Sequence, residues 1–135
     1  MEAQGAGVAR GVVDSVNGES VVLRVPHTDY RLRLRVDEGA APPAGKRVRG
    51  RIEAEATKIH PSAGGGRFIE PIDGEPRIIA GRVLRVEEET GRVLVEAAVP
   101  MWLEATDGQD FSVIRAGGMV NCYVRSGARF IPERG

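Results

Sequence analysis

Cysteine and aromatic residues are the scarcest features of this sequence. Cys122 is the only cysteine in 135 residues, so no intramolecular disulfide can form, and we expect a reducing, cytoplasmic location. Aromatic residues make up 4% of the chain. A nucleic-acid binder that stacks several bases on aromatic rings would therefore find few platforms here.

Net charge and long apolar runs are also absent. Nineteen basic residues balance nineteen acidic ones, so attraction to nucleic acid or to an anionic membrane has to come from a local patch. The longest apolar run, residues 97–103, contains Pro100 and is far shorter than the roughly 20 residues that span a bilayer. The first ten residues, MEAQGAGVAR, contain no basic segment followed by an apolar one. We expect neither a signal peptide nor contact with a membrane.

The residue patterns of common enzymes and metal sites are missing as well. His27 and His60 are the only histidines, and neither has a further ligand at the spacing typical of zinc sites, so no metal is expected. Asp14 and Ser15 precede His27, but no strained nucleophile turn accompanies the serine. We therefore expect that the protein is not an enzyme.

What the sequence does contain is period-two alternation of apolar and polar residues, which predicts strands. Leucines and arginines alternate in residues 30–36. Residues 46–56 alternate in the same way, which favours a strand over the competing helix. Asn17-Gly18 predicts a hairpin turn, and Pro42-Pro43 excludes a helix between the last two strands. The strands expected in the first half are residues 8–16, 20–25, 30–36 and 46–56.

The second half predicts strands of similar length and order. Gly81 lies inside the first of them and indicates a bulge or bend. One helical turn is expected between residues 111 and 116. Cys122 alternates with valines, which favours an inert thiol in the core over a nucleophile. The expected strands are residues 77–87, 92–98, 101–105, 119–125 and 128–131.

Residues 61–76, rich in glycine and proline, separate the two halves. The run Gly64–Gly66 is followed by neither the Lys-Ser/Thr of a phosphate loop nor a helix, so no nucleotide cofactor is expected. A flexible connector is the favoured interpretation, and a nest of backbone N–H groups around an anion is the alternative. Phe68 and Ile69 could instead pack beneath the junction of the halves and make the segment a structural clasp.

The two halves match when they are aligned at an offset of about seventy residues. Gly11 then aligns with Gly81, and Gly45 aligns with Gly117. The order of strands, turns and loops is the same in both, which indicates an internal duplication. We expect a first β-barrel repeat over residues 8–60, the connector over 61–76, and a second repeat over 77–132.

The GxV–turn–VxL/V–loop–GxxV pattern of each half resembles small five-stranded barrels of the OB-fold and TOBE type, which often occur in tandem. The segment GGGRFIEPIDGEP resembles one found in bacterial proteins of unassigned function. The resemblance implies an all-β protein of two tandem OB-like barrels. A module of about 65 residues buries little surface by itself, so the two should pack together.

Two arginine-rich strand faces are the candidate site. If the two strands are neighbours, six guanidinium groups cover one outer surface, which suits a phosphate backbone. A solvated face paired with nearby carboxylates such as Glu53 is the competing interpretation. The candidate ligand-binding residues are Arg31, Arg33, Arg35, Arg47, Arg49 and Arg51.

The sequence as a whole predicts a non-catalytic binding or assembly module. A protein partner or self-association is the leading expectation. Trp102 is expected to be half buried at the junction of the two repeats, and an anchor for a partner is the less favoured interpretation. Single-stranded nucleic-acid binding through the six arginines is the alternative.

Overall fold

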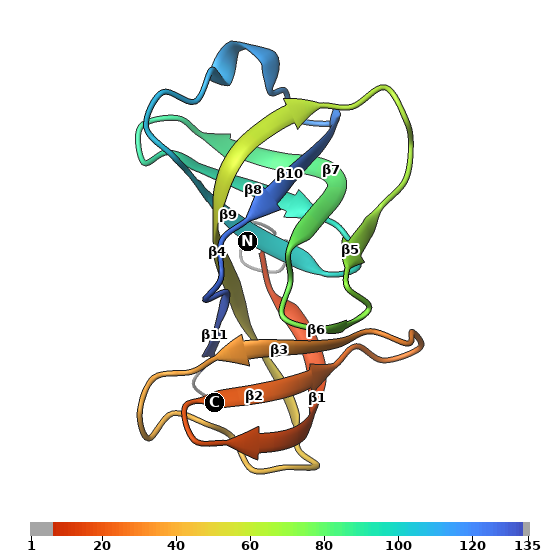
Figure 1. The fold of residues 1–135 in the computed structure, drawn as a ribbon, viewed down its shortest axis with the longest axis vertical. Helices are drawn as coiled ribbons and strands as arrows, with labels where there is room; N and C mark the ends of the chain where they lie inside the picture. The colour runs from red at the N-terminus through yellow and green to blue at the C-terminus, as the bar shows by residue number, and fades with distance from the viewer. Residues whose placement is uncertain (1–6, 134–135) are drawn as a thin grey trace.

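The structure, a computed structural model that describes residues 7–133, is all-β (Figure 1). Eleven strands form one mixed sheet, and the helical element within these residues is a single 3₁₀ turn, η1 (Phe111–Val113). The strands are β1 (Ala9–Asn17), β2 (Ser20–Arg24), β3 (Arg31–Arg35), β4 (Arg47–Pro61), β5 (Phe68–Glu70), β6 (Asp73–Gly74), β7 (Ile78–Glu87), β8 (Arg92–Glu96), β9 (Pro100–Ala105), β10 (Met119–Val124) and β11 (Arg129–Pro132).

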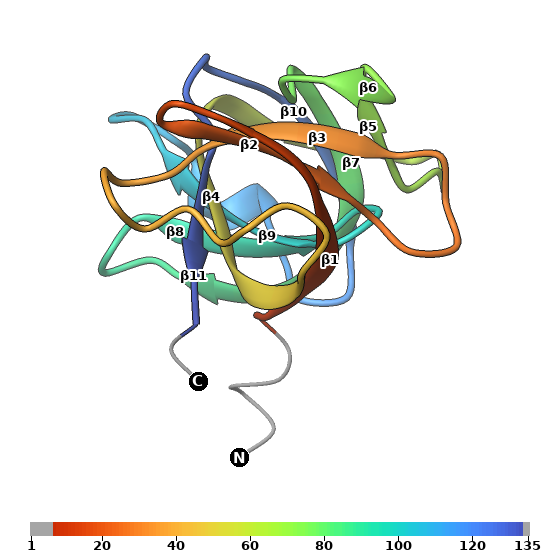
Figure 2. The same cartoon turned by 90° about the horizontal axis from the view of Figure 1, so that it is seen from below.

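Two closed circuits of strand pairing both include β4. One circuit runs from β4 through β1, β2, β3 and β11 back to β4, and the other runs through β10, β7, β8 and β9. We call the strands of these circuits the first group and the second group. In Figure 1 the first group lies below and the second above, with β4 running between them; Figure 2 shows the first group from its end. The change of partners occurs at Glu53, which pairs with Arg129 of β11 and with Trp102 of β9.

Alternating apolar side chains fill the interior of both groups. Leu32 and Leu34 are buried while the arginines between them are exposed, as the alternation predicts. Along β4, Ile52 and Ala56 belong to the same buried cluster. A single core therefore extends through both groups, and β4 contributes side chains along most of its length.

The strand β4 is longer than the sequence predicts, and it changes which strands close each half. The last strand expected in the first half ends at residue 56, within a barrel closed by its own strands. Instead, residues 56–61 of β4 pair with β10 of the second group, and β11 pairs with β3 and the first part of β4. The physical reason is that β4 changes its inward parity after Ala56, at a register shift against β10, so that Ile59 is buried in the second group. Each half thus provides a strand to the other.

Equivalent backbone hydrogen bonds occur in both halves. The Gly45 N–H donates to the Val13 carbonyl at 2.7 Å, and the Gly117 N–H donates to the Val83 carbonyl at 2.7 Å. The two glycines have φ angles of 87° and 90°, in the region that favours glycine. These matched turns support the predicted duplication.

The bulge expected at Gly81 lies elsewhere. The register of β7 shifts between Val83 and Arg85, and β1 shifts at the corresponding point between Val13 and Ser15. Gly81 is instead a point of close backbone approach, where a Cβ would lie 2.2 Å from the carbonyl oxygen of Glu96.

The predicted flexible connector is wrong for the part that follows the three glycines. β5 pairs with β7 of the second group, and β6 pairs with β3 of the first. Ile69 is buried and its N–H donates to the Tyr30 hydroxyl at 3.2 Å, whereas Phe68 is exposed. This segment therefore forms the clasp that was the alternative expectation, with Ile69 as its buried residue.

Candidate binding surfaces

The six predicted arginines do not form one surface. β11 lies between β3 and β4, with Arg129 beside Arg35 on one side and beside Glu53 on the other. The expectation that the two arginine-rich strands are neighbours is therefore wrong. Because β11 pairs with β3 only at Arg35 and β4 does not pair with β3, Arg31 and Arg33 lie apart from the arginines of β4.

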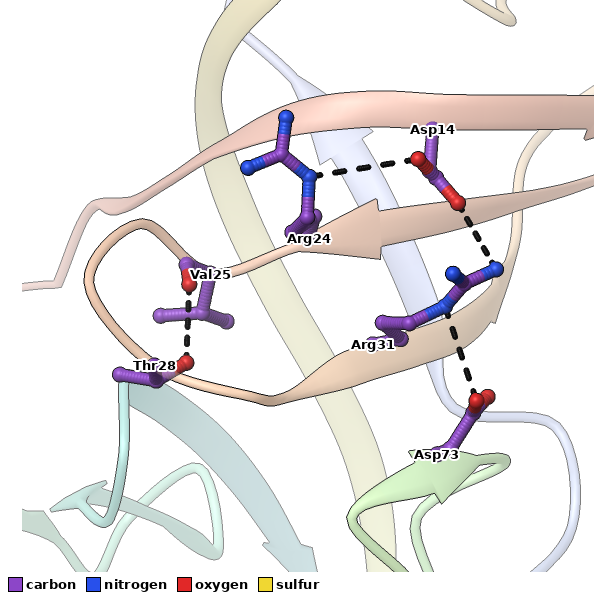
Figure 3. Close-up of polar contacts among 6 residues, drawn as sticks. All are labelled: Asp14, Arg24, Val25, Thr28, Arg31 and Asp73. Carbon is purple, nitrogen blue, oxygen red and sulfur yellow. Dashed lines mark hydrogen bonds and ion pairs between the residues drawn. The ribbon is translucent and has the colours of Figure 1, made fainter.

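Arg31 belongs to a local ion-pair network (Figure 3). Its Nη2 lies 2.8 Å from Asp14 Oδ2 of β1, and its Nε lies 3.6 Å from Asp73 Oδ2 of β6. Arg24 of β2 approaches the other oxygen of Asp14 at 3.9 Å. The network joins four strands and neutralises most of the charge at this point. It also engages Asp14, which is therefore paired with arginines rather than with His27.

Arg51 is likewise engaged. Its Nη2 lies 3.3 Å from Glu53 Oε2, and its guanidinium lies 5.0 Å from the centre of the Trp102 ring. Arg92 of β8 contacts the same two residues, at 3.1 Å from Glu53 Oε2 and 4.8 Å from the ring centre. The two guanidinium groups and the carboxylate leave Trp102 only 8% exposed. Trp102 therefore lies at the junction of the halves, more deeply buried than an apolar docking anchor would be.

The remaining arginines of β4 line a groove of about 1000 Å³ on the outside of the first group. Arg10 of β1 lies directly beside Arg49 of β4, and Val12 lies between Arg47 on one side and Arg24 on the other. Lys46 adds a further cation where the loop enters β4. We call this feature the basic groove. Its cations are Arg10, Arg24, Lys46, Arg47 and Arg49.

The basic groove has far more positive than negative charge. Among residues 7–133, Glu133 is the one acidic residue that lines it; its carboxylate pairs with Arg49 Nε, and its N–H donates to the Arg49 carbonyl at 2.9 Å. Within residues 7–133, Arg10, Lys46 and Arg47 have no carboxylate oxygen within 4.0 Å. The charge balance of the whole chain thus conceals a strongly cationic region.

Sequence reasoning found two of these five cations. Arg47 and Arg49 belong to the predicted set, whereas Arg10, Arg24 and Lys46 do not. Arg10 has the outward parity of a residue between buried Ala9 and Gly11, which was a usable signal. The pairing of β1 with β4 that brings Arg10 to Arg49 depends on how the sheet closes, and no local pattern encodes that.

A second hollow, of about 380 Å³, lies where the two groups meet. We call it the waist cavity. Its walls come from both groups: Arg35 of β3 and Arg129 of β11 on one side, and Trp102 and Glu104 of β9 on the other. Arg35 is the predicted site residue that the structure places here.

The cysteine is buried as predicted. The Cys122 side chain is 3% exposed among core residues, and burial raises the pKa of the thiol to about 12. At neutral pH the sulfur is therefore protonated and a poor nucleophile.

No protein-family model, curated protein or solved structure matches this chain. Residues 7–133 include no helix of the length and hydropathy needed to cross a membrane.

Proposed function

We propose that this protein is a non-catalytic binding module that holds single-stranded nucleic acid by its phosphates in the basic groove. The observation that carries the proposal is the group of three cations, Arg10, Lys46 and Arg47, that have no carboxylate partner within residues 7–133. Arginine and lysine are the side chains that most often contact nucleic-acid phosphates.

The frame we propose is a pair of small OB-like barrels that share β4 and arose by duplication, with repeats over residues 8–60 and 77–132. Two closed circuits of strand pairing support it, as do the equivalent glycine turns at Gly45 and Gly117. OB-type barrels are a common frame for binding single strands. The frame by itself does not define a ligand, so the groove must carry the argument.

Two like-charged side chains are directly opposed in the basic groove. Arg10 and Arg49 are lateral partners in adjacent strands, an arrangement that is destabilising by itself. Glu133 offsets the charge of Arg49 only. A phosphate placed between the two guanidinium groups would relieve their repulsion and accept charge-assisted hydrogen bonds from both.

The groove favours contact with the backbone over recognition of bases. No phenylalanine, tyrosine or tryptophan lines it, so base stacking contributes little there. We therefore expect weak sequence preference and strong dependence on salt. If four cations each displace a counterion from a single strand, the slope of log K against log salt is about −3.

The expected protein partner or self-association has less support. An apolar anchor needs exposure, and Trp102 is buried beneath two arginines. The exposed large apolar side chains lie on separate elements, with Val16 on β1, Phe68 on β5 and Tyr123 on β10. Phe68 and Tyr123 lie on the two strands that flank β7 and face outward together, but Val16 lies apart from them on β1 of the first group, and two side chains make a small surface for docking a protein.

Fluorescence anisotropy of labelled single-stranded DNA and RNA tests the proposal across a salt series. We expect dissociation constants on the order of micromolar at low salt, with little difference between sequences. A triple variant, Arg10→Gln, Lys46→Gln and Arg47→Gln, should abolish this binding.

The matched control is a triple variant, Arg33→Gln, Arg82→Gln and Arg115→Gln. It removes the same charge from three exposed positions outside the groove. Binding that survives in the control and disappears in the groove variant supports the proposal. Equal losses in both would show that net charge alone attracts the nucleic acid, and absence of binding to the wild-type protein at low salt would refute the proposal outright.

A further inference from the structure

The waist cavity has charges of opposite sign on its two sides, and several are already neutralised. Glu53 pairs with Arg51 and Arg92, as described above. Arg129 Nη2 lies 3.1 Å from Asp37 Oδ1. Of the residues that line the cavity, these pairs neutralise Glu53, Arg92 and Arg129.

Three charged groups of the cavity remain without an ion-pair partner within the described part of the chain. They are the guanidinium of Arg35 on β3 and the carboxylates of Glu55 on β4 and Glu104 on β9. The cation and the two anions belong to strands separated by β11. From β3 across β11, β4 lies two inter-strand spacings away and β9 three, which correspond to roughly 10 Å and roughly 14 Å between the backbones.

The two carboxylates lie side by side, and Glu104 also has Arg92 of β8 as its other lateral partner, whose guanidinium is paired with Glu53. Glu55 and Glu104 are lateral partners in the parallel pairing of β4 with β9, so their side chains leave the sheet on the same face. Like charges directly opposite one another destabilise a sheet. An external cation between the two carboxylates would remove this repulsion.

The cation is better matched by an organic ammonium than by a metal ion. Residues 7–133 contain no group of three or more acidic, histidine or cysteine residues arranged to hold a metal. Trp102 lines the cavity beside the carboxylates but is only 8% exposed, with Arg51 and Arg92 over its ring, so it provides an apolar wall rather than a free face for a cation. A volume of about 380 Å³ is at the small end of the range for small-molecule sites.

We propose that the waist cavity binds a small zwitterion, with its ammonium group between Glu55 and Glu104 and its carboxylate at Arg35. The ligand class is an amino acid whose two charged groups are separated by a short alkyl chain. This site is distinct from the basic groove and does not depend on nucleic-acid binding.

The sequence supplies a built-in reporter for this site. Trp102 is the only tryptophan and lines the cavity, so its fluorescence reports occupancy directly. We would titrate the protein with ε-aminocaproate, and in parallel with n-hexylamine and hexanoate, which carry one charge each. Calorimetry gives the same affinities without relying on the ring.

We expect ε-aminocaproate to bind with a dissociation constant on the order of a millimolar or below. The two singly charged compounds should bind at least about tenfold more weakly, because each leaves one charged wall unpaired. Equal binding of n-hexylamine would overturn the proposal in favour of a simple cation site. No fluorescence or heat signal with any of the three would overturn it as well.

Matched variants locate the binding. Arg35→Gln and Glu104→Gln should each weaken ε-aminocaproate about tenfold or more. Arg33→Gln changes the same strand outside the cavity, and Glu88→Gln removes an acidic side chain that does not line it. These two controls should bind as the wild type does. Loss in the controls, or unchanged binding in Arg35→Gln, would contradict the assignment.

Thermal unfolding without ligand provides an independent measurement. Because Glu104 is opposed by Glu55, Glu104→Gln should raise the midpoint of unfolding at low salt. A lowered midpoint would show that the carboxylate already has a partner within the protein, which would refute the proposal. Failure here leaves the nucleic-acid proposal unaffected, since the variants of the basic groove test that separately.

Discussion

The outer faces of two corresponding strand pairs, β2–β3 and β8–β9, differ sharply. In the first group Val22 and Arg33 are lateral partners, and Arg33 is exposed. In the second group Leu94 and Trp102 are lateral partners and are only 1% and 8% exposed. The strand order is the same, yet one face is open to solvent and the other is covered.

The cover of the second face comes from the rest of the molecule. Arg51 and Arg92 lie over the Trp102 ring, and Gly7 approaches so closely that a Cβ there would lie 2.8 Å from Trp102 Nε1. The second group therefore uses this face to join the two halves, whereas the first group keeps its outer surface charged.

Replacing Trp102 and Arg33 by alanine should show the largest difference between the two faces. Trp102→Ala should lower the free energy of unfolding by about 3–5 kcal/mol, as for other buried aromatic side chains. Arg33→Ala, at the corresponding position, should change it by less than about 0.5 kcal/mol. Chemical denaturation of both variants measures the difference. Equal effects would mean that the two faces are not used differently.

A methyl group added at Gly81 should have the next largest effect. The Cβ of Gly81→Ala would meet the Glu96 carbonyl oxygen at 2.2 Å, whereas that of Gly11→Ala would meet Leu23 Cγ at 2.7 Å and the Arg24 carbonyl oxygen at 2.9 Å, which is a less severe overlap with the backbone. We expect losses of about 3 kcal/mol at Gly81 and about 1 kcal/mol at Gly11. Denaturant titration measures the two losses of stability. A larger loss at Gly11 than at Gly81 would contradict the closer backbone approach at Gly81.

The smallest effect on stability is expected at Cys122. The alignment that places Gly45 on Gly117 places Gly50 on Cys122. In the folded state the pKa of the thiol is about 12, above the value of 9.0 for a free thiol. The unfolded chain therefore loses this proton first, and the stability that comes from the protonated thiol is lost as pH rises from about 9 to 12. Between pH 8 and pH 10 the wild type should lose about 1.4 kcal/mol more than Cys122→Ala.

Thiol labelling provides a second test of the same group. At equal pH the thiolate fraction of the folded protein should be about a thousandfold lower than that of the denatured protein, because the pKa values differ by roughly three. Fast labelling of the native protein would place Cys122 outside the core.

Local patterns in the sequence predicted the strands well, because the alternation and the turn signals that define a strand depend only on neighbouring residues. The alternation around Leu32 and Leu34 and the Asn17-Gly18 turn, where Asn17 pairs with Ser20, are confirmed. The exposed arginines of β3 are confirmed too. The resemblance to paired OB-like barrels stays a prediction that the closed circuits of strand pairing support.

Pairing between distant strands could not be predicted. The separation of Arg31 from Arg49 follows from the insertion of β11, which comes about eighty residues after Arg49 in the sequence. The basic groove depends on the same closure, because it brings Arg10 of β1 beside β4. The waist cavity was missed for a further reason, since its walls come from strands of both halves.

The position of β11 also has a consequence for biosynthesis. Ala128 accepts a hydrogen bond from Arg35 at 2.9 Å, and Phe130 is 1% exposed within the cluster that fills the first group. Domains usually fold from the N-terminus while the ribosome is still extending the chain. Here the first group lacks a strand until almost the last described residue has left the ribosome. Until then the edges of β3 and β4 are unpaired, and these are the edges through which nascent chains would aggregate.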